Sequence, residues 1–136
     1  MLLEALVAIL VFSAGIIGLI GLQAASIRST TEAKYRTDAA FLANKVISQM
    51  WVDNNLTLAA TYAGTGGTGG PGYTAWLAEV SSTTTGLPGA TAATNPPTIA
   101  IGANNVVTVT VRWQKPGDQL IHQYITTTQI VANPPV

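Results

Sequence analysis

Residues 4–27 decide the fold of this chain, and they read EALVAILVFSAGIIGLIGLQAASI. No residue from Ala5 to Ile27 is charged. A helix over this stretch is roughly 35 Å long at about 1.5 Å per residue, and the apolar core of a bilayer is about 30 Å thick. The sequence therefore predicts a transmembrane or assembly helix over residues 1–27.

Glu4 is the carboxylate at the edge of this apolar stretch. An ionisable group there is costly and by default indicates function, although a hydrated interfacial glutamate is the simpler alternative. A cleaved signal peptide is disfavoured, because no basic stretch precedes the run and no cleavage site with a change of composition follows it. We expect the segment to remain in the mature protein.

Three glycines, Gly15, Gly18 and Gly21, recur at every third position of the apolar stretch. Small residues let membrane helices approach closely, and each glycine weakens the helix by about 1 kcal/mol relative to alanine. We predict a role in helix packing or local softening. The alternative is that glycine is simply common in membrane helices.

Residues 28–53 predict an amphipathic continuation of the same helix. Leu42, Val46 and Met50 recur at four-residue steps, and opposite charges lie four residues apart on the other side. Asn54-Asn55 is a plausible stop because asparagine tolerates the left-handed conformation. The apolar stripe needs a surface to cover it, and the sheet that follows is the best candidate.

Residues 54–97 form a connecting region rich in Gly, Thr and Pro. Its segment 64–72, GTGGTGGPG, predicts a flexible loop, and a short helix is expected near 74–80. The glycines match the letters of a dinucleotide-binding motif. They lack the strand before, the helix after and the correctly spaced acidic residue that such a site needs.

Residues 98–136 predict an antiparallel β-sheet. A strand begins at Thr98, and Val107, Val109 and Val111 alternate with polar residues in the clearest strand. A last strand is expected from Leu120 to Val131. We predict an α+β protein in which the long helix packs on a three-stranded antiparallel sheet. Its helix-on-sheet core is expected to contain Leu42, Val46, Met50, Val107, Val109 and Val111.

Composition disfavours several classes of function. Six basic and six acidic residues balance, so no electrostatic steering toward nucleic acid is expected. Cysteine is absent, and His122 is the single histidine, mid-strand and without an obvious ligand set. We expect neither a metal site nor a cofactor, and we expect no enzymatic activity.

The first ten residues, MLLEALVAIL, resemble the start of a mature type IV pilin. Residues 12–23, FSAGIIGLIGLQ, are similar to the V-type minor pilins, the type IV pilus modification proteins. Trp76-Leu77, Val80 and Leu87-Pro88-Gly89 fit the middle of that family more loosely. In the family the glutamate is normally fifth, so the resemblance implies that a leader and a preceding Phe are missing here.

The resemblance implies a pilin-like fold and a minor pilin that primes pilus assembly at or near the fibre tip. It implies cleavage of a precursor by prepilin peptidase, N-methylation, and pairing of Glu4 with the N-terminal amine of a neighbouring subunit. The implied partners are other minor pilins, the major pilin and a tip adhesin. The implied location is the bacterial inner membrane, with the C-terminal domain in the periplasm, and then the fibre.

Two alternatives stay open. A minor pseudopilin of a type II secretion system shares the helix and the sheet. A single-span envelope protein with a small binding domain belongs to another class, and it has no need for Glu4. The basic residues that follow the span favour a cytoplasmic C-terminal domain by the positive-inside rule, whereas the pilin resemblance implies a periplasmic one.

Overall fold

The computed structural model describes residues 1–131, and the chain divides into two units, Met1–Tyr35 and Arg36–Val136. One helix, α1 (Leu2–Val52), begins in the first unit and ends in the second. The sequence predicted this helix to about residue 53, and the structure confirms the long N-terminal helix.

The first unit contains the apolar part of α1, and every residue from 1 to 30 is exposed. Within residues 1–131, α1 is the one helix whose length and composition suit a membrane span. Its hydroxyl groups are satisfied inside the helix: Ser13 Oγ donates to the Ile9 carbonyl at 2.7 Å, and Thr30 Oγ1 donates to that of Ser26 at 3.0 Å. Such internal bonds let polar side chains reside in an apolar helix.

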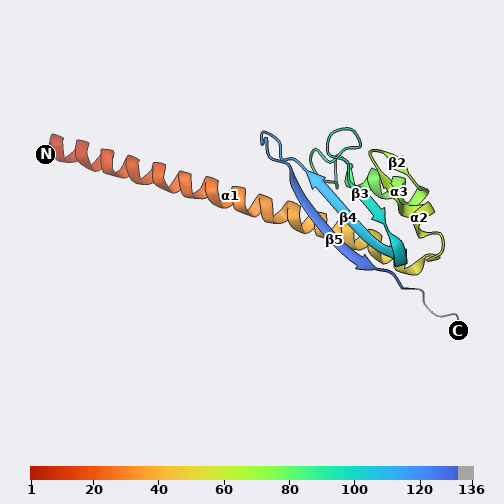
Figure 1. Cartoon of the computed structure of the whole chain (residues 1–136). Helices are drawn as coiled ribbons and strands as arrows, with labels where there is room; N and C mark the ends of the chain where they lie inside the picture. Colours follow the sequence, from red (N-terminus) through yellow and green to blue (C-terminus); the bar gives the residue numbers. More distant parts are fainter. Residues whose placement is uncertain (132–136) are drawn as a thin grey trace. The chain divides into compact units, whose positions relative to one another are not determined.

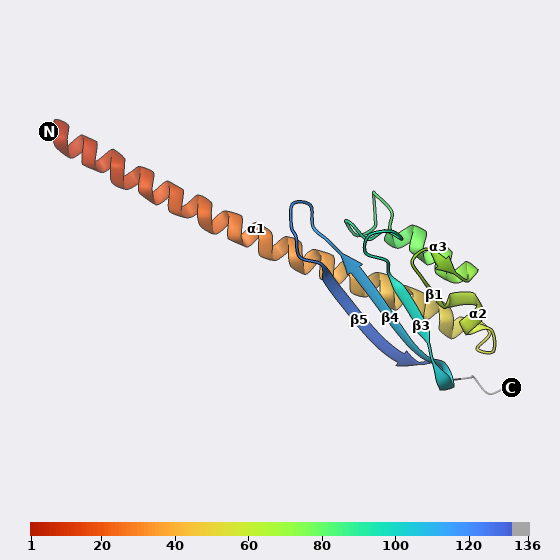
Figure 2. The ribbon, with the colours of Figure 1, turned by 45° about the horizontal axis from the view of Figure 1, so that its top comes forward.

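The second unit begins with the amphipathic part of α1. Its buried stripe consists of Ala39, Leu42, Ala43, Val46, Ile47 and Met50. The spacing of three and four residues places these side chains on one side of the helix. Figures 1 and 2 show this part of α1 lying along one face of the sheet.

The sheet has five antiparallel strands in the order β2-β1-β3-β4-β5, which corrects the prediction of three. The predicted strands are β3 (Thr98–Ile101), β4 (Val106–Trp113) and β5 (His122–Gln129). The two additional strands, β1 (Gly64–Thr65) and β2 (Thr68–Gly69), are short. They come from the glycine-rich segment that was expected to be a loop.

The glycine-rich segment is a hairpin because two glycines form its turn. Gly66 and Gly67 have φ values of 57° and 84°. Positive φ at both central residues is the requirement of a two-residue type I′ turn, which glycine meets without strain. The expectation of a flexible loop over 64–72 was therefore wrong about the backbone.

One helix precedes this hairpin and another follows it. The helix α2 (Leu58–Tyr62) is a single turn that the sequence did not predict, and α3 (Pro71–Val80) begins three residues earlier than expected. Pro71 stands at the start of α3, where its missing N–H has no helical partner to lose. A Cβ at Gly70 would lie 2.2 Å from the Ala60 carbonyl oxygen, so α2 and α3 approach closely there.

The strand β4 carries the centre of the core. Val107, Val109 and Val111 are fully buried, while Thr108 and Arg112 on the opposite face are half-buried. Asn104 and Asn105, both with positive φ, turn the chain into β4. Trp76 Nε1 of α3 donates to the Leu42 carbonyl of α1 at 3.0 Å, so α3 is tied to the same helix that covers the sheet.

Candidate assembly and docking surfaces

Glu4 lies in the first turn of α1, on an exposed part of the helix. The first turn of a helix favours a carboxylate by about 0.3–1 kcal/mol, because the unpaired N–H groups there carry partial positive charge. When Glu4 leaves water for an apolar bundle, it needs a positive partner.

The three glycines of the first unit face open space within their own chain. A Cβ added at Gly15, Gly18 or Gly21 would meet no atom within 4 Å apart from the backbone of α1 itself. Packing within residues 1–131 therefore gives no reason for glycine at these positions. These glycines can therefore allow close packing only against lipid or against another chain.

The six residues expected in the helix-on-sheet core are all buried in the second unit. Leu42 is 4% exposed, and the other five are fully buried: Val46, Met50, Val107, Val109 and Val111. These residues form a structural core, because none carries a polar or reactive group.

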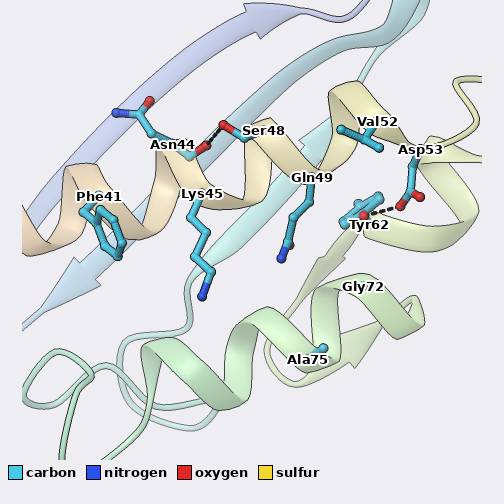
Figure 3. A pocket seen from close by; sticks show the side chains of 10 residues that line it. All are labelled: Phe41, Asn44, Lys45, Ser48, Gln49, Val52, Asp53, Tyr62, Gly72 and Ala75. Atoms are coloured by element: carbon cyan, nitrogen blue, oxygen red, sulfur yellow. Dashed lines mark hydrogen bonds between the residues drawn. The ribbon is translucent and has the colours of Figure 1, made fainter.

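The structure adds a groove that the sequence did not indicate. It is an open groove with a volume of about 860 Å³ beside α1 in the second unit. Figure 3 shows Lys45 and Gln49 reaching from α1 toward α3. The lining residues are Phe41, Asn44, Lys45, Ser48, Gln49, Val52, Asp53, Tyr62, Gly72 and Ala75.

Two charge-assisted contacts line this groove. Lys45 of α1 forms an ion pair with Glu79 of α3, and the hydroxyl of Tyr62 donates to the Asp53 carboxylate. Burial, and then the hydrogen bond with Asp53, raises the pKa of Tyr62 to about 12. Tyr62 therefore remains protonated at neutral pH and acts as a donor. The arrangement suits binding and bracing.

A second polar cluster lies where the chain passes from β4 to β5. Asp118 Oδ2 lies 3.5 Å from both Lys115 Nζ and His122 Nε2, and the His122 ring stacks on Trp113 with centroids 5.7 Å apart. A hydrogen bond from the Leu120 backbone N–H, with further help from His122 and Lys115, lowers the pKa of the Asp118 carboxyl. The described residues contain no group of three metal-ligating side chains.

His122 was expected to lie mid-strand without an obvious ligand set, and the structure places it at the first residue of β5 beside Asp118. Their four-residue separation, across a turn that contains Pro116 and Gly117, was the available signal for this cluster. Asp118 N–H donates to the Lys115 carbonyl at 3.1 Å, which closes this turn. The cluster braces the end of the β4–β5 pair.

Comparison of the chain with protein-family models, with curated proteins and with solved structures finds no match. The proposal for its function therefore rests on its residues and their geometry.

Proposed function

We propose that the chain is a minor pilin, a non-enzymatic structural subunit that helps to initiate a type IV pilus at or near the fibre tip. One observation carries the proposal. The first half of α1 is apolar and exposed and has Glu4 in its first turn, whereas an apolar stripe on the second half is buried in a small domain with an antiparallel sheet. A simple membrane anchor needs the apolar half but has no use for the carboxylate.

Electrostatics gives Glu4 its role in assembly. In the membrane the carboxylate stays at the water boundary, whereas in a bundle of apolar helices it is removed from water. A buried carboxylate without a cation is destabilising by several kcal/mol. The N-terminal amine of a neighbouring subunit is the proposed cation, and the pairing sets the axial register between subunits.

The remaining features support an assembly subunit. The glycine positions of α1 are open to another chain, since a Cβ there meets nothing in this one. Small residues at such positions allow close helix approach. The proposed partners are other minor pilins, the major pilin and a tip adhesin. The proposed location is the inner membrane with a periplasmic domain, and then the fibre.

A single-span envelope protein with a binding domain is the second candidate, and the groove beside α1 favours it. The groove is lined by both polar and apolar side chains, and Phe41 is 65% exposed at its rim. Such a protein inserts into the membrane and binds its ligand without polymerising. Glu4 then has no role beyond the interface.

The test separates membrane insertion from assembly. The Glu4→Gln variant keeps the size of the side chain but removes its charge. We expect wild-type amounts in membranes and at least a tenfold loss from sheared pili, the effect of about 1.4 kcal/mol. Glu4→Asp should recover part of the incorporation, because the shorter side chain misplaces the charge.

Glu79→Gln is the matched control, because it removes one carboxylate from the second unit, where assembly through α1 does not need it. It should enter pili at wild-type levels. Entry of the Glu4→Gln variant at wild-type levels would overturn the assembly role. Copurification of wild-type chain with secretion proteins instead of pilus proteins would assign it to the pseudopilins.

A further inference from the structure

The strand β5 is the open edge of the sheet. It pairs with β4 through eight consecutive residue pairs, from Val106↔Gln129 to Trp113↔His122, and the described part of the chain places no strand beyond it. The other edge strand, β2, is only two residues long. A long edge strand presents unpaired backbone groups, whereas a very short one does not.

The register shows which backbone groups face the open edge. Ile130 N–H donates to the Asn105 carbonyl at 3.0 Å, and antiparallel pairs alternate between hydrogen-bonded and non-bonded. His122, Tyr124, Thr126 and Thr128 therefore bond to β4. The residues between them direct their N–H and C=O groups to the open edge, and their side chains are exposed: Gln123, Ile125, Thr127 and Gln129.

This edge lacks the devices by which proteins block strand pairing. Natural edges carry proline, lysine, inward-facing charges or bulges. The strand reads HQYITTTQ, with no proline and no Lys, Arg, Asp or Glu, and its pairing with β4 runs without a bulge. Its β-branched residues also favour the extended conformation.

We propose that the β5 edge binds an extended, uncharged segment of a partner protein, which adds to the sheet as a sixth strand through main-chain hydrogen bonds. This is strand addition, in which the backbone supplies the affinity and alternate side chains supply specificity. The proposal requires neither Glu4 nor assembly into a fibre. It applies equally to a pilin and to an envelope-anchored binding domain.

The neighbours of the added strand determine its character. Residues opposite one another on adjacent strands lie about 4.5–5.5 Å apart at Cβ. Gln123, Ile125, Thr127 and Gln129 offer amide, hydroxyl and apolar surface, with no charge to balance a charged residue on the added strand. An uncharged strand rich in Thr, Gln and β-branched residues is therefore the complementary partner.

A second copy of the chain is a poor occupant. Symmetric antiparallel pairing of two β5 edges places both α1 helices on the same face of the joined sheet. The residue-36 ends of those helices then point in opposite directions, so this pairing has to accommodate two antiparallel helices as well as two strands. A partner that contributes only an extended segment has no such requirement.

A synthetic peptide of residues 122–129, HQYITTTQ, is the probe, because it carries the strand without α1. It can pair antiparallel with β5 so that Thr126 lies opposite Thr126 and Ile125 opposite Thr127. We expect saturable binding of the labelled peptide to the full chain in detergent micelles, measured by fluorescence anisotropy. Amide hydrogen exchange should slow at Gln123, Ile125 and Thr127 and stay unchanged at Thr126.

The variants separate backbone pairing from side-chain contact. Thr127→Pro removes an edge-facing N–H without removing a main-chain bond to β4, and proline is tolerated on edge strands. It also loses the contact of the Thr127 hydroxyl with that of Thr108 of β4 at 3.2 Å, which Thr127→Val loses as well. Thr127→Pro should weaken binding at least tenfold. Thr127→Val keeps the N–H and loses only the hydroxyl, and it should bind within about twofold of wild type.

A peptide that is N-methylated at the amides facing β5 tests the same main-chain hydrogen bonds without altering the protein, and it should not bind. Failure of the unmodified peptide to bind at millimolar concentration would overturn the proposal. So would equal binding of the N-methylated peptide, or undiminished binding by Thr127→Pro.

Discussion

The two parts of α1 have the same backbone and opposite environments. From residue 2 to 30 every side chain is exposed, including Ile9, Phe12 and Ile17. From Ala39 to Met50 an apolar stripe is buried within the second unit. Tertiary packing within the described residues therefore supports the second part of the helix and not the first.

In the second part, burial of the stripe stabilises the helix. Tertiary packing of one face is the usual source of helix stability in proteins. The first part has no such support from the described chain, and its large apolar residues are exposed to whatever surrounds them. A bilayer or a bundle of similar helices would supply such an environment, since both remove apolar side chains from water.

The largest expected effect comes from Val46→Asp, which places a charge in the fully buried stripe. We expect a loss of about 3–5 kcal/mol in the free energy of unfolding of the second unit, because packing is lost and the charge has no partner. Chemical denaturation of the full chain in detergent measures it. Ser48→Asp, on the exposed side of the same helix, should change stability by less than about 0.5 kcal/mol.

A substitution of valine by aspartate in the first part of α1 should affect membrane insertion instead of the stability of the second unit. Val11→Asp should leave the denaturation midpoint of the second unit unchanged, because Val11 is 64% exposed and lies in the first unit. It should reduce membrane insertion by about 2.5–3.5 kcal/mol. Carbonate extraction of membranes measures the loss. A fall in domain stability equal to that of Val46→Asp would remove the distinction between the two parts.

Tyr62→Phe tests a tie at the end of α1, where the Tyr62 hydroxyl donates to Asp53. Loss of the hydrogen bond should cost about 1 kcal/mol at neutral pH. The pKa of Tyr62 is raised to about 12 in the folded chain, against about 10 in an unfolded one. The stability contributed by the protonated hydroxyl is therefore complete below pH 10 and is lost as the pH rises to 12.

The measurement is the difference in unfolding free energy between wild type and Tyr62→Phe across this pH range. The difference should be constant up to about pH 10 and should then shrink. Tyr73, whose pKa burial also raises, is present in both proteins and does not affect the comparison. A difference that grows above pH 10 would contradict the assignment.

The smallest expected effect comes from Lys45→Met, which breaks the ion pair with Glu79. Both side chains are partly exposed, at 40% and 36%, so water weakens their attraction. We expect a loss of about 0–1 kcal/mol that decreases at high salt. A double-mutant cycle with Glu79→Gln isolates the pair. A coupling of several kcal/mol would show that this contact, more than the apolar stripe, holds α1 to α3.

The features that sequence predicted are those with a repeating pattern. The uncharged run and the spacing of Leu42, Val46 and Met50 gave α1 nearly to its end. The alternation of Val107, Val109 and Val111 with polar residues gave β4. In these segments apolar side chains recur in a regular pattern, because the environment of each position is set by its place in the helix or strand.

The missed features lack such a pattern. The strands β1 and β2 consist of Gly and Thr, and no apolar alternation marks them. The signal was the Gly66-Gly67 dipeptide between two threonines, which is typical of a two-residue hairpin. Similarly, Pro71 at the first position of α3 was the signal for its earlier start.

The groove and the open edge could not be predicted, because each depends on segments that are far apart in the sequence. The groove needs the turn after Val52 to bring Tyr62 and Ala75 beside α1. The open edge depends on which strand lies last in the sheet, and no local sequence pattern indicates the order of the strands. Glu4 was identifiable only because its surroundings are uniformly apolar.

The position of β4 late in the chain has a consequence for biosynthesis. The stripe of α1 ends at Met50, and the valines buried with it end at Val111, some 60 residues later. A ribosome adding about 5–20 residues per second needs roughly 3–12 s to make that stretch. During this interval the stripe has no sheet to cover it, while the apolar half before it is already complete. Early insertion of that half into a membrane would hold the uncovered stripe at the bilayer surface, away from other nascent chains, until the last strands arrive.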